Sequence, residues 1–526
     1  MTEVAFSAPH REAANIGLKV LEEGGNAVDA MIAGAAAISV LYPHMNSLAG
    51  DGFWLIHEPG HAPRAIDACG TAAERASIGY YREQGLEAIP PRGAPSTLTM
   101  AGTLAGWQRA RELIGETRHL KPLKELLAPA ATLAREGVPV TESLAAASRK
   151  VSTELQAETE YQWLFTRKGA PLKVGDTLRN PELGDFLDRL ARQGLKSFYR
   201  GEIAGELAAA LEAAGSPLRL SDFENYHAKL VRPLSVTTRF GECYNLPAPT
   251  QGLASLIILA LYDRLYRDDW SEAQKIHTLV EATKQAFLIR DREIADPRYM
   301  RQLGQLWLAD QTLDELAGRV GDTASPWPRV AEPGDTVWMG CVDRRGTMVS
   351  FIQSLYWEFG SGVVIPGTGL VWNNRGLSFR LDPDHHNALR PGARPLHTLN
   401  PALALFNDGR RMAYGSMGGE GQPQTQAALL TRYWYDGLPL DEAINRGRWL
   451  LGRTWGETDD DLKLEADLAD RVGDELARMG HRTRTVPSHS EMMGHAGAVV
   501  ALNGGPVIAA SDPRSDGAGL VGRAPA

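Results

Sequence analysis

A β-patterned run begins inside the segment Gly334-Asp335-Thr336-Val337-Trp338-Met339-Gly340-Cys341-Val342-Asp343. A threonine after Gly-Asp is most often the first residue of a strand that follows a turn. If the chain cuts itself before Thr336, that residue also gains a free α-amino group, which can activate its own hydroxyl as a nucleophile. An unperturbed α-amino group titrates near ~7.7–8.0, so part of it is neutral at physiological pH without a histidine partner.

The residues before Thr336 form a turn-rich linker. Residues 321–328 and 332–335 are rich in Pro, Gly and Asp, which can continue neither a helix nor a central strand. We expect a surface loop, because the new N-terminus must separate from its former neighbour. Cleavage between Asp335 and Thr336 would divide the chain into residues 1–335 and 336–526.

Composition sets outer limits on function. The chain has 526 residues, 43% of them hydrophobic, and a net charge of -9, which favours a large core and argues against a nucleic-acid surface. The first ten residues do not resemble a secretory signal, and no segment reaches the ~20 apolar residues of a spanning helix. The apolar segment Leu253–Leu261 is predicted as a core helix. Three cysteines without metal-ligand spacing suit a reducing compartment, so we predict a cytoplasmic protein without membrane contact.

Helical patterns dominate the first part of the chain, and β patterns follow Thr336. Residues 11–40 predict two amphipathic helices broken at Gly24-Gly25, with Asn26 as the cap of the second. Further helices are predicted over residues 122–136, 181–195, 202–214 and 274–292. Strands are predicted over residues 231–244, 336–342, 347–354 and 363–372.

Short motifs along the whole chain resemble those of the γ-glutamyltranspeptidase family, in the same order. They include Gly24-Gly25-Asn26-Ala27-Val28-Asp29-Ala30, Leu48-Ala49-Gly50-Asp51-Gly52-Phe53, Ala101-Gly102-Thr103-Leu104-Ala105-Gly106-Trp107, Asn373-Asn374, Gly415-Ser416-Met417-Gly418-Gly419 and Ser511-Asp512-Pro513-Arg514-Ser515. Each motif alone is weak evidence, and their order across the chain is strong evidence. The resemblance implies an α+β fold, the four-layer αββα sandwich of N-terminal nucleophile hydrolases, built as one domain from both cleavage products. It implies no cofactor, and a dimer of the cleaved heterodimers is a further expectation.

The resemblance also assigns roles to individual residues. The Thr336 hydroxyl would attack the Asp335 carbonyl during maturation and a substrate amide during turnover. Gly418 and Gly419 match the family's paired glycines and would supply N–H groups to the oxyanion, although Gly-Gly after a strand is most often a tight turn. Ser354 stands where the family has a threonine beside the nucleophile, and would bind the Thr336 hydroxyl or amine.

Departures from the family pattern concern the substrate. The arginine that holds a glutamyl α-carboxylate is replaced by Cys69, and the residues that grip the α-amino group are replaced by Tyr356, Arg375 and Ser378. His397 and Thr398 stand in place of paired serines. A γ-glutamyl head group would lack its clamp, and Arg375 would repel its ammonium group.

Arg375 suits a carboxylate, which a planar guanidinium binds with two hydrogen bonds. It follows Asn374, so the resemblance puts the carboxylate near the scissile carbonyl, with Tyr356, Asn374, His397 and Thr398 as further substrate contacts. In these features the chain resembles the oxamate amidohydrolases of purine and allantoin breakdown, which are a branch of the family. Two other roles remain open: a salt bridge from Arg375 to an aspartate such as Asp382, and packing for His397.

Other functions also remain open. The chain could be a γ-glutamyl hydrolase or transpeptidase, a cephalosporin or glutaryl acylase-like amidase, or an unprocessed binding protein. No metal is predicted, because the adjacent His385 and His386 are expected to point to different sides of their loop. No glycine-rich phosphate loop precedes a helix, so no nucleotide is assigned.

Overall fold

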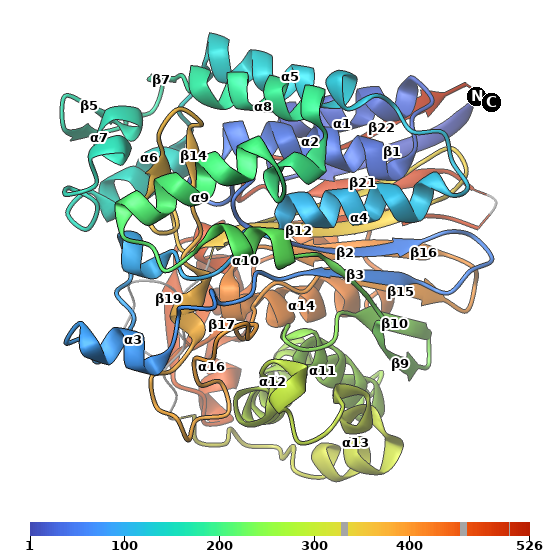
Figure 1. The fold of residues 1–526 in the computed structure, drawn as a ribbon. Helices are drawn as coiled ribbons and strands as arrows, with labels where there is room; N and C mark the ends of the chain where they lie inside the picture. Colours follow the sequence, from blue (N-terminus) through green and yellow to red (C-terminus); the bar gives the residue numbers. More distant parts are fainter. Residues whose placement is uncertain (328–334, 453–459, 504, 526) are drawn as a thin grey trace.

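Two β-sheets pack face to face, and helices cover the outer face of each (Figure 1). The computed structural model describes residues 1–327, 335–452, 460–503 and 505–525. Both chain ends lie at the same corner, where the first and last strands pair along their whole length. The predicted α+β class and four-layer αββα sandwich are therefore confirmed.

The first sheet carries Thr336 on a central strand, and all of its strand pairs are antiparallel. Its order is β22 (Ala518–Ala524), β1 (Thr2–Ala8), β11 (Asp335–Val342), β12 (Met348–Tyr356), β2 (Asp51–His57), β3 (Arg64–Ala68) and β8 (Lys229–Val231). The predicted strands at 336–342 and 347–354 thus exist and pair with each other.

The second sheet is also antiparallel throughout. Its order is β21 (Val507–Ser511), β20 (Ala496–Ala501), β16 (Arg411–Ser416), β15 (Ala402–Phe406), β10 (Gly241–Asn245) and β9 (Leu234–Thr238). The single strand predicted over residues 231–244 is wrong: the turn at Arg239-Phe240 folds that segment into the β9–β10 hairpin. Gly241 has φ +147°, a conformation that glycine adopts without steric cost.

Helices of the first half of the chain cover the first sheet. These helices are α1 (Arg11–Glu22), α2 (Ala27–Leu41), α4 (Thr103–Gly115), α5 (Leu123–Glu136) and α8 (Pro181–Gln193), of which α5 and α8 pack outside α2. Asn26 caps α2 by accepting a hydrogen bond from Asp29 N at 2.9 Å, as predicted. The expected amphipathic character of α2 is wrong. All its residues are buried, because the sheet lies on one side and α5 on the other.

The second sheet is covered by helices from later in the chain. They are α11 (Gly252–Leu265), α12 (Glu272–Glu293), α13 (Asp310–Ala317), α14 (Gln422–Trp434), α15 (Leu440–Asn445) and α16 (Ala466–Arg478). The apolar segment Leu253–Leu261 lies buried within α11, as the sequence predicts. No helix in the described parts of the chain combines the length and the apolar character needed to cross a bilayer.

Short elements complete the fold. The first half of the chain also contains the helices α3 (Ile78–Glu83), α6 (Glu142–Val151), α7 (Thr159–Phe165), α9 (Glu202–Ala214) and α10 (Leu220–Asn225). Short 3₁₀ turns occur along the described chain: η1 (Ala94–Ser96), η2 (Leu195–Phe198), η3 (Pro297–Tyr299), η4 (Gly304–Leu308), η5 (Arg375–Ser378), η6 (Gly419–Gly421) and η7 (Glu491–Met493). Small sheets join β4 (Val138–Pro139) with β7 (Thr177–Leu178), β5 (Thr166–Arg167) with β6 (Ala170–Pro171), β13 (Val364–Ile365) with β14 (Leu370–Val371), and β17 (Trp449–Leu451), β18 (Leu462–Glu465) and β19 (Thr483–Val486). The strand predicted over residues 363–372 is therefore a two-stranded hairpin.

Trp338 fills the space between the two sheets. A Cβ atom at Gly340, Gly415 or Gly497 would lie 2.5, 2.1 or 2.5 Å from its ring, so these glycines make room for the indole. The indole N–H donates to Ser350 Oγ at 3.0 Å. The close packing fixes the distance between β11 and the second sheet two residues after Thr336.

The predicted linker is only partly within the described residues. Residues 321–327 form turns and bends with mostly exposed or half-buried side chains, which agrees with a surface segment. The rest of the linker, residues 328–334, lies outside the described part. The three cysteines are buried, and none of them forms a disulfide within the described chain.

Candidate active site

A row of polar side chains crosses the first sheet at one end. In a strand, residues two apart face the same side of the sheet. The neighbouring residues Trp338, Ile352 and Phe53 on β11, β12 and β2 all belong to the core between the sheets. Two positions further along each strand, on the same face, lie Thr336, Ser354 and Asp51. Ser354 and Asp51 are direct partners in the sheet.

Thr336 lies at a β-bulge. The register of β11 and β12 shifts between Asp335 and Val337, so Thr336 faces two residues of β12, Ser354 and Leu355. Bulges re-aim side chains and are common beside active sites. Thr336 is 1% exposed, and its hydroxyl makes no hydrogen bond within the described chain. The Thr336 hydroxyl is therefore buried, and no structural hydrogen bond within the described chain occupies it.

Tyr356 connects the end of β12 to the arginine that the sequence singles out. Its N–H donates to Ser354 Oγ at 2.8 Å, and its φ of +89° is a strained backbone conformation for a residue other than glycine. The Arg375 guanidinium stacks on the Tyr356 ring, with its carbon 3.7 Å from the ring centre. The predicted residues Ser354, Tyr356 and Arg375 thus form one contact chain.

Arg375 is buried without an acidic partner. It is 2% exposed, its Nη2 donates to Leu396 O at 2.5 Å, and its Nη1 donates to Thr398 Oγ1 at 3.3 Å. Its Nε has no hydrogen-bond partner, and no ion pair to Asp382 or another carboxylate exists among the described residues. A buried guanidinium with an open donor has the chemistry to bind an anion.

Asp51 and His397 form a second buried pair beside it. His397 Nε2 lies 2.8 Å from Asp51 Oδ2, and Leu399 N donates to His397 Nδ1 at 3.3 Å. These partners assign a neutral imidazole whose Nε2–H donates to Asp51. Burial raises the pKa of Asp51 to about 7, although the Gly70 N–H and the charge of Arg375 act in the opposite direction. Burial, and then the Arg375 charge, lower the pKa of His397 well below its usual value.

The paired glycines lie at the end of β16. Gly418 has φ +119° and Gly419 φ +52°, and the turn leads through η6 into α14. Within the described chain, neither N–H donates a hydrogen bond. Gln251 Nε2 donates to both Thr398 O at 2.7 Å and Gly419 O at 2.8 Å, so it fastens this turn to the loop that holds Arg375.

Other predicted contacts have structural partners. Asn374 N donates to Leu355 O, its Oδ1 accepts from Trp357 N, and its Nδ2 donates to Pro91 O. Asn374 thus ties η5 to the end of β12. Its substrate contact stays a prediction, and Ser378 likewise uses its hydroxyl on a main-chain carbonyl.

Sequence reasoning missed Asp51 and Gln251. Asp51 is flanked by glycines in the family motif, but only the pairing of β2 with β12 puts it beside Ser354. A polar residue at an inward-facing strand position is the signal that could have pointed to Asp51. Gln251 carries no such signal, because it precedes an apolar helix and resembles an ordinary cap residue.

One three-residue cluster in the row has the spacing of metal ligands. Asp51, Cys69 and His397 bring ligand atoms within 4.8 Å of one another. Burial raises the pKa of the Cys69 thiol, the His397 N–H is committed to Asp51, and the Arg375 charge opposes a second cation. We therefore assign Asp51 and His397 as a hydrogen-bonded pair under the influence of the Arg375 charge, with Cys69 beside it.

A second cluster with the spacing of metal ligands lies beside the described start of the linker, at Gly321. His277, Glu281 and His481 also bring ligand atoms within 4.8 Å. Lys284 Nζ already donates to Glu281 at 2.6 Å, so an ammonium group occupies the position of a cation. His277 Nδ1 lies 2.8 Å from His481 Nε2, and His277 Nε2 lies 2.8 Å from the carbonyl of Gly321.

The adjacent histidines of the Pro-Asp-rich loop do not point to different sides, which corrects the sequence expectation. The rings of His385 and His386 stack with their centres 4.3 Å apart and their planes at 29°. Burial, and then the neighbouring His385, lower the pKa of His386. Neither residue belongs to a metal-ligand group among the described residues.

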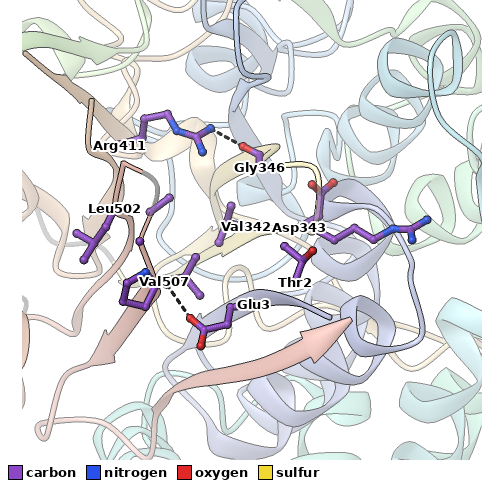
Figure 2. A pocket seen from close by; sticks show the side chains of 12 residues that line it. Thr2, Glu3, Val342, Asp343, Gly346, Arg411, Leu502 and Val507 are labelled. Atoms are coloured by element: carbon purple, nitrogen blue, oxygen red, sulfur yellow. Dashed lines mark hydrogen bonds between the residues drawn. The ribbon is translucent and has the colours of Figure 1, made fainter. Parts of the chain in front are cut away.

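Two pockets lie at opposite ends of the β11–β12 pair. One of about 340 Å³ adjoins Tyr356 and is lined mainly by Ile89, Trp357, Leu377 and Phe379. Another, of about 520 Å³, opens at the other end of β11, ~20 Å from Thr336 at the usual rise per residue (Figure 2). The second pocket is therefore separate from the candidate site.

Comparisons with known proteins agree with this geometry. A family model described as gamma-glutamyltranspeptidase matches residues 13–522. The oxamate amidohydrolase proenzyme of Klebsiella pneumoniae is 49% identical over 513 residues, 97% of each chain. The glutathione hydrolase-like YwrD proenzyme of Bacillus subtilis is 35% identical over 524 residues, 99% of this chain and 98% of that protein. The crystal structure of a cephalosporin acylase from Bacillus halodurans matches with a TM-score of 0.89 and 31% identity, over 99% of this chain and 96% of the other. The chain therefore belongs to the γ-glutamyltranspeptidase family, with the fold of the N-terminal nucleophile hydrolases, and is an enzyme that acts on amides.

Proposed function

We propose that this amidohydrolase hydrolyses oxamate to oxalate and ammonia through an acyl-enzyme on Thr336. The observation that carries the proposal is Arg375, a buried guanidinium with an open Nε donor, beside the strand end that holds the nucleophile. Arg375 stacks on Tyr356, which pairs with Asp335 beside the nucleophile, so a carboxylate on Arg375 would lie near that strand end. Oxamate, whose carboxylate is bonded directly to its amide carbon, is the shortest acid amide that fits this arrangement. The similarity to an oxamate amidohydrolase proenzyme supports the same substrate.

Maturation would begin with attack of the Thr336 hydroxyl on the Asp335 carbonyl. The peptide bond becomes an ester on Oγ1, and water then hydrolyses the ester to release residues 1–335 and 336–526. The bulge and the unengaged hydroxyl of Thr336 support this step. Both products remain in one sandwich, because β1 from the first part pairs with β11 and β22 from the second.

In turnover, the α-amino group of Thr336 takes the hydroxyl proton while Oγ1 attacks the amide carbon. The tetrahedral oxyanion would accept hydrogen bonds from the N–H groups of Gly418 and Gly419, which have no other acceptor in the described chain. The proton passes to the leaving nitrogen, ammonia departs, and an oxalyl ester remains on Thr336. Water then attacks the ester, and Ser354 orients the Thr336 hydroxyl or amine throughout.

The remaining predicted contacts complete the acid-binding end of the site. Tyr356 and Thr398 support the guanidinium by stacking and by a hydrogen bond. His397 acts through Asp51 rather than by direct contact with the substrate. Asn374 holds η5, which carries Arg375, against the end of β12 through its hydrogen bonds. We further propose a cytoplasmic location in purine breakdown and a dimer of heterodimers.

One specific observation favours a second candidate. The pocket beside Tyr356 is mainly apolar and could take a longer acyl chain, and a cephalosporin acylase is among the similar structures. A glutaryl amidase would use Arg375 for the distal carboxylate and this pocket for the chain. A γ-glutamyl hydrolase is less compatible, because Arg375 would face the substrate ammonium group.

Three substrates tested in parallel distinguish these candidates. Oxamate is followed by ammonia release, and γ-glutamyl and glutaryl anilides are followed by the colour of the freed aniline. We expect kcat/KM for oxamate to exceed the other two at least 100-fold. A higher value for either anilide would refute the oxamate assignment. Thr336→Ala serves as the inactive control.

A further inference from the structure

Arg375 and Asp51 are the unpaired charges of the site. Elsewhere around the row, charges neutralise one another by contact: Asp67 forms an ion pair with Arg394. Asp51 contacts no arginine or lysine among the described residues, and its charged-group contact is the neutral His397. Asp51 and Arg375 therefore balance each other through space.

In the intact chain, the titratable groups that act on Asp51 are Arg375, His397, Cys69, Asp67, Tyr199 and Tyr226. Processing would add the α-amino group of Thr336, which lies in the same row and titrates near ~7.7–8.0 when unperturbed. Burial raises the pKa of Cys69, Tyr199 and Tyr226 above their usual values, so all three are neutral near pH 7. The sole permanent cation among these groups is Arg375.

An anion that docks on Arg375 disturbs this balance. The buried site would then hold one guanidinium and two carboxylates, which costs free energy in a medium of low dielectric constant. A proton that restores the neutrality of the site can bind to the Asp51 carboxylate, because its oxygens have unused lone pairs. It cannot easily reach His397 Nδ1, because that atom already accepts from the N–H of Leu399.

We propose that Asp51 takes up one proton from solvent when an anionic substrate binds Arg375, so that the substrate carboxylate replaces Asp51 as the counter-ion of the guanidinium. This inference rests on the proposed function, because it needs a carboxylate on Arg375. Asp51 is a positioning residue that makes the site bind acids together with a proton. Affinity for small acids should then fall as Asp51 becomes ionised in the free enzyme.

The expected proton uptake follows from the ionisation of Asp51. With a pKa of about 7 in the free enzyme, the carboxyl is ~10% protonated at pH 8 and ~90% protonated at pH 6. If binding keeps it protonated, uptake is about 0.9 proton at pH 8 and about 0.1 at pH 6. The dissociation constant should rise towards tenfold per pH unit above pH 7.

Isothermal titration calorimetry of the processed enzyme tests the inference, with pyruvate as the probe because it carries one negative charge, like oxamate, and has no amide to hydrolyse. Heats measured at pH 8 in triethanolamine and in Tris, whose ionisation enthalpies differ, give the number of protons taken up. We expect uptake near 0.9 in the wild-type protein and none in Asp51→Asn. Cys69→Ser, which changes a neutral neighbour in the same row, should keep the wild-type value.

The outcomes separate this inference from the proposed function. Pyruvate that binds the wild type without proton uptake overturns the inference and leaves the carboxylate site on Arg375 intact. Uptake that persists in Asp51→Asn also overturns it, because another group would then carry the proton. Failure of pyruvate to bind refutes the proposed function, and with it this inference. If Asp51→Asn does not fold, the wild-type pH dependence decides, because uptake through Asp51 must fall from about 0.9 at pH 8 to about 0.1 at pH 6.

Discussion

Replacing Arg375 with glutamine should abolish most oxamate turnover without unfolding the protein. The variant removes a buried charge that would hold the substrate carboxylate. Truncating one partner of a buried, hydrogen-bonded charge pair costs about 2–5 kcal/mol. At 1.36 kcal/mol per factor of ten, kcat/KM for oxamate should fall about 30-fold to about 5,000-fold.

The structure also indicates why the fold should tolerate this change. Leu396 O, which accepts from Arg375, also accepts from Ser378 Oγ at 2.9 Å, so it keeps a donor. Arg375 makes no direct ion pair among the described residues, and its removal relieves the burial of a charge. Asp51, whose charge Arg375 balances through space, can then remain protonated, because burial already raises its pKa to about 7. The melting temperature and the extent of self-cleavage should therefore stay close to wild type.

The assay is ammonia release at several oxamate concentrations, with a denaturing gel of the same samples. Arg375→Lys should lie between wild type and Arg375→Gln, because it keeps the charge and loses the planar donor pair. Arg319→Gln, which changes an exposed arginine away from the row, serves as the control and should be unchanged. Arg375→Gln activity within threefold of wild type would refute the carboxylate role, and loss of self-cleavage would make Arg375 a structural residue.

Four further perturbations test other parts of the account. Thr336→Ala should run as one band of about 57 kDa on a denaturing gel and release no ammonia; two bands would remove Thr336 from the cleavage. Gly418→Ala forces an alanine to φ +119° at the proposed oxyanion donors, so kcat should drop on the order of 100-fold, and an unchanged kcat would exclude that role. Gly497→Ala pushes a methyl group against the Trp338 ring and should cost about 1–3 kcal/mol in chemical denaturation, unless the indole moves freely. Burial and then nearby charges lower the pKa of His481 to about 4, below its unfolded value. The neutral His481 therefore stabilises the folded protein fully above pH ~6.5, and this contribution is lost as the pH falls to 4. His481→Gln should make the melting temperature depend less on pH over that range, and an equally steep fall in the variant would contradict this.

Sequence patterns predicted the elements whose signals are local. Asn26 caps α2 where the sequence places a cap, and the helices at 122–136 and 202–214 are present within a residue or two. These features depend on neighbouring residues, whose backbone hydrogen bonds and caps form within a few positions. The order of the family motifs likewise predicted the layered fold, because it spans the chain.

Errors arose where burial or a turn overrode the local pattern. Helix α2 is buried on every side because a second helix layer, not solvent, lies above it. The alternating residues from 231 to 244 read as one strand, but β9 and β10 are two strands of a hairpin around Phe240. Alternation reports which residues share a face and carries no information on where the chain reverses.

By itself, the sequence determined the chemistry available to this protein: a threonine that could become an N-terminus, a nearby glycine pair, and an arginine where relatives bind an amine. Only the tertiary structure decided how these groups meet. The antiparallel pairing of β2 and β12 sets Asp51 beside Ser354, about 300 residues away along the chain, and the pairing of β11 with β12 sets Thr336 in the same row. Strand pairing between distant segments depends on the whole packed sandwich, because hydrogen bonds between strands are the same for any sequence and burial selects the register.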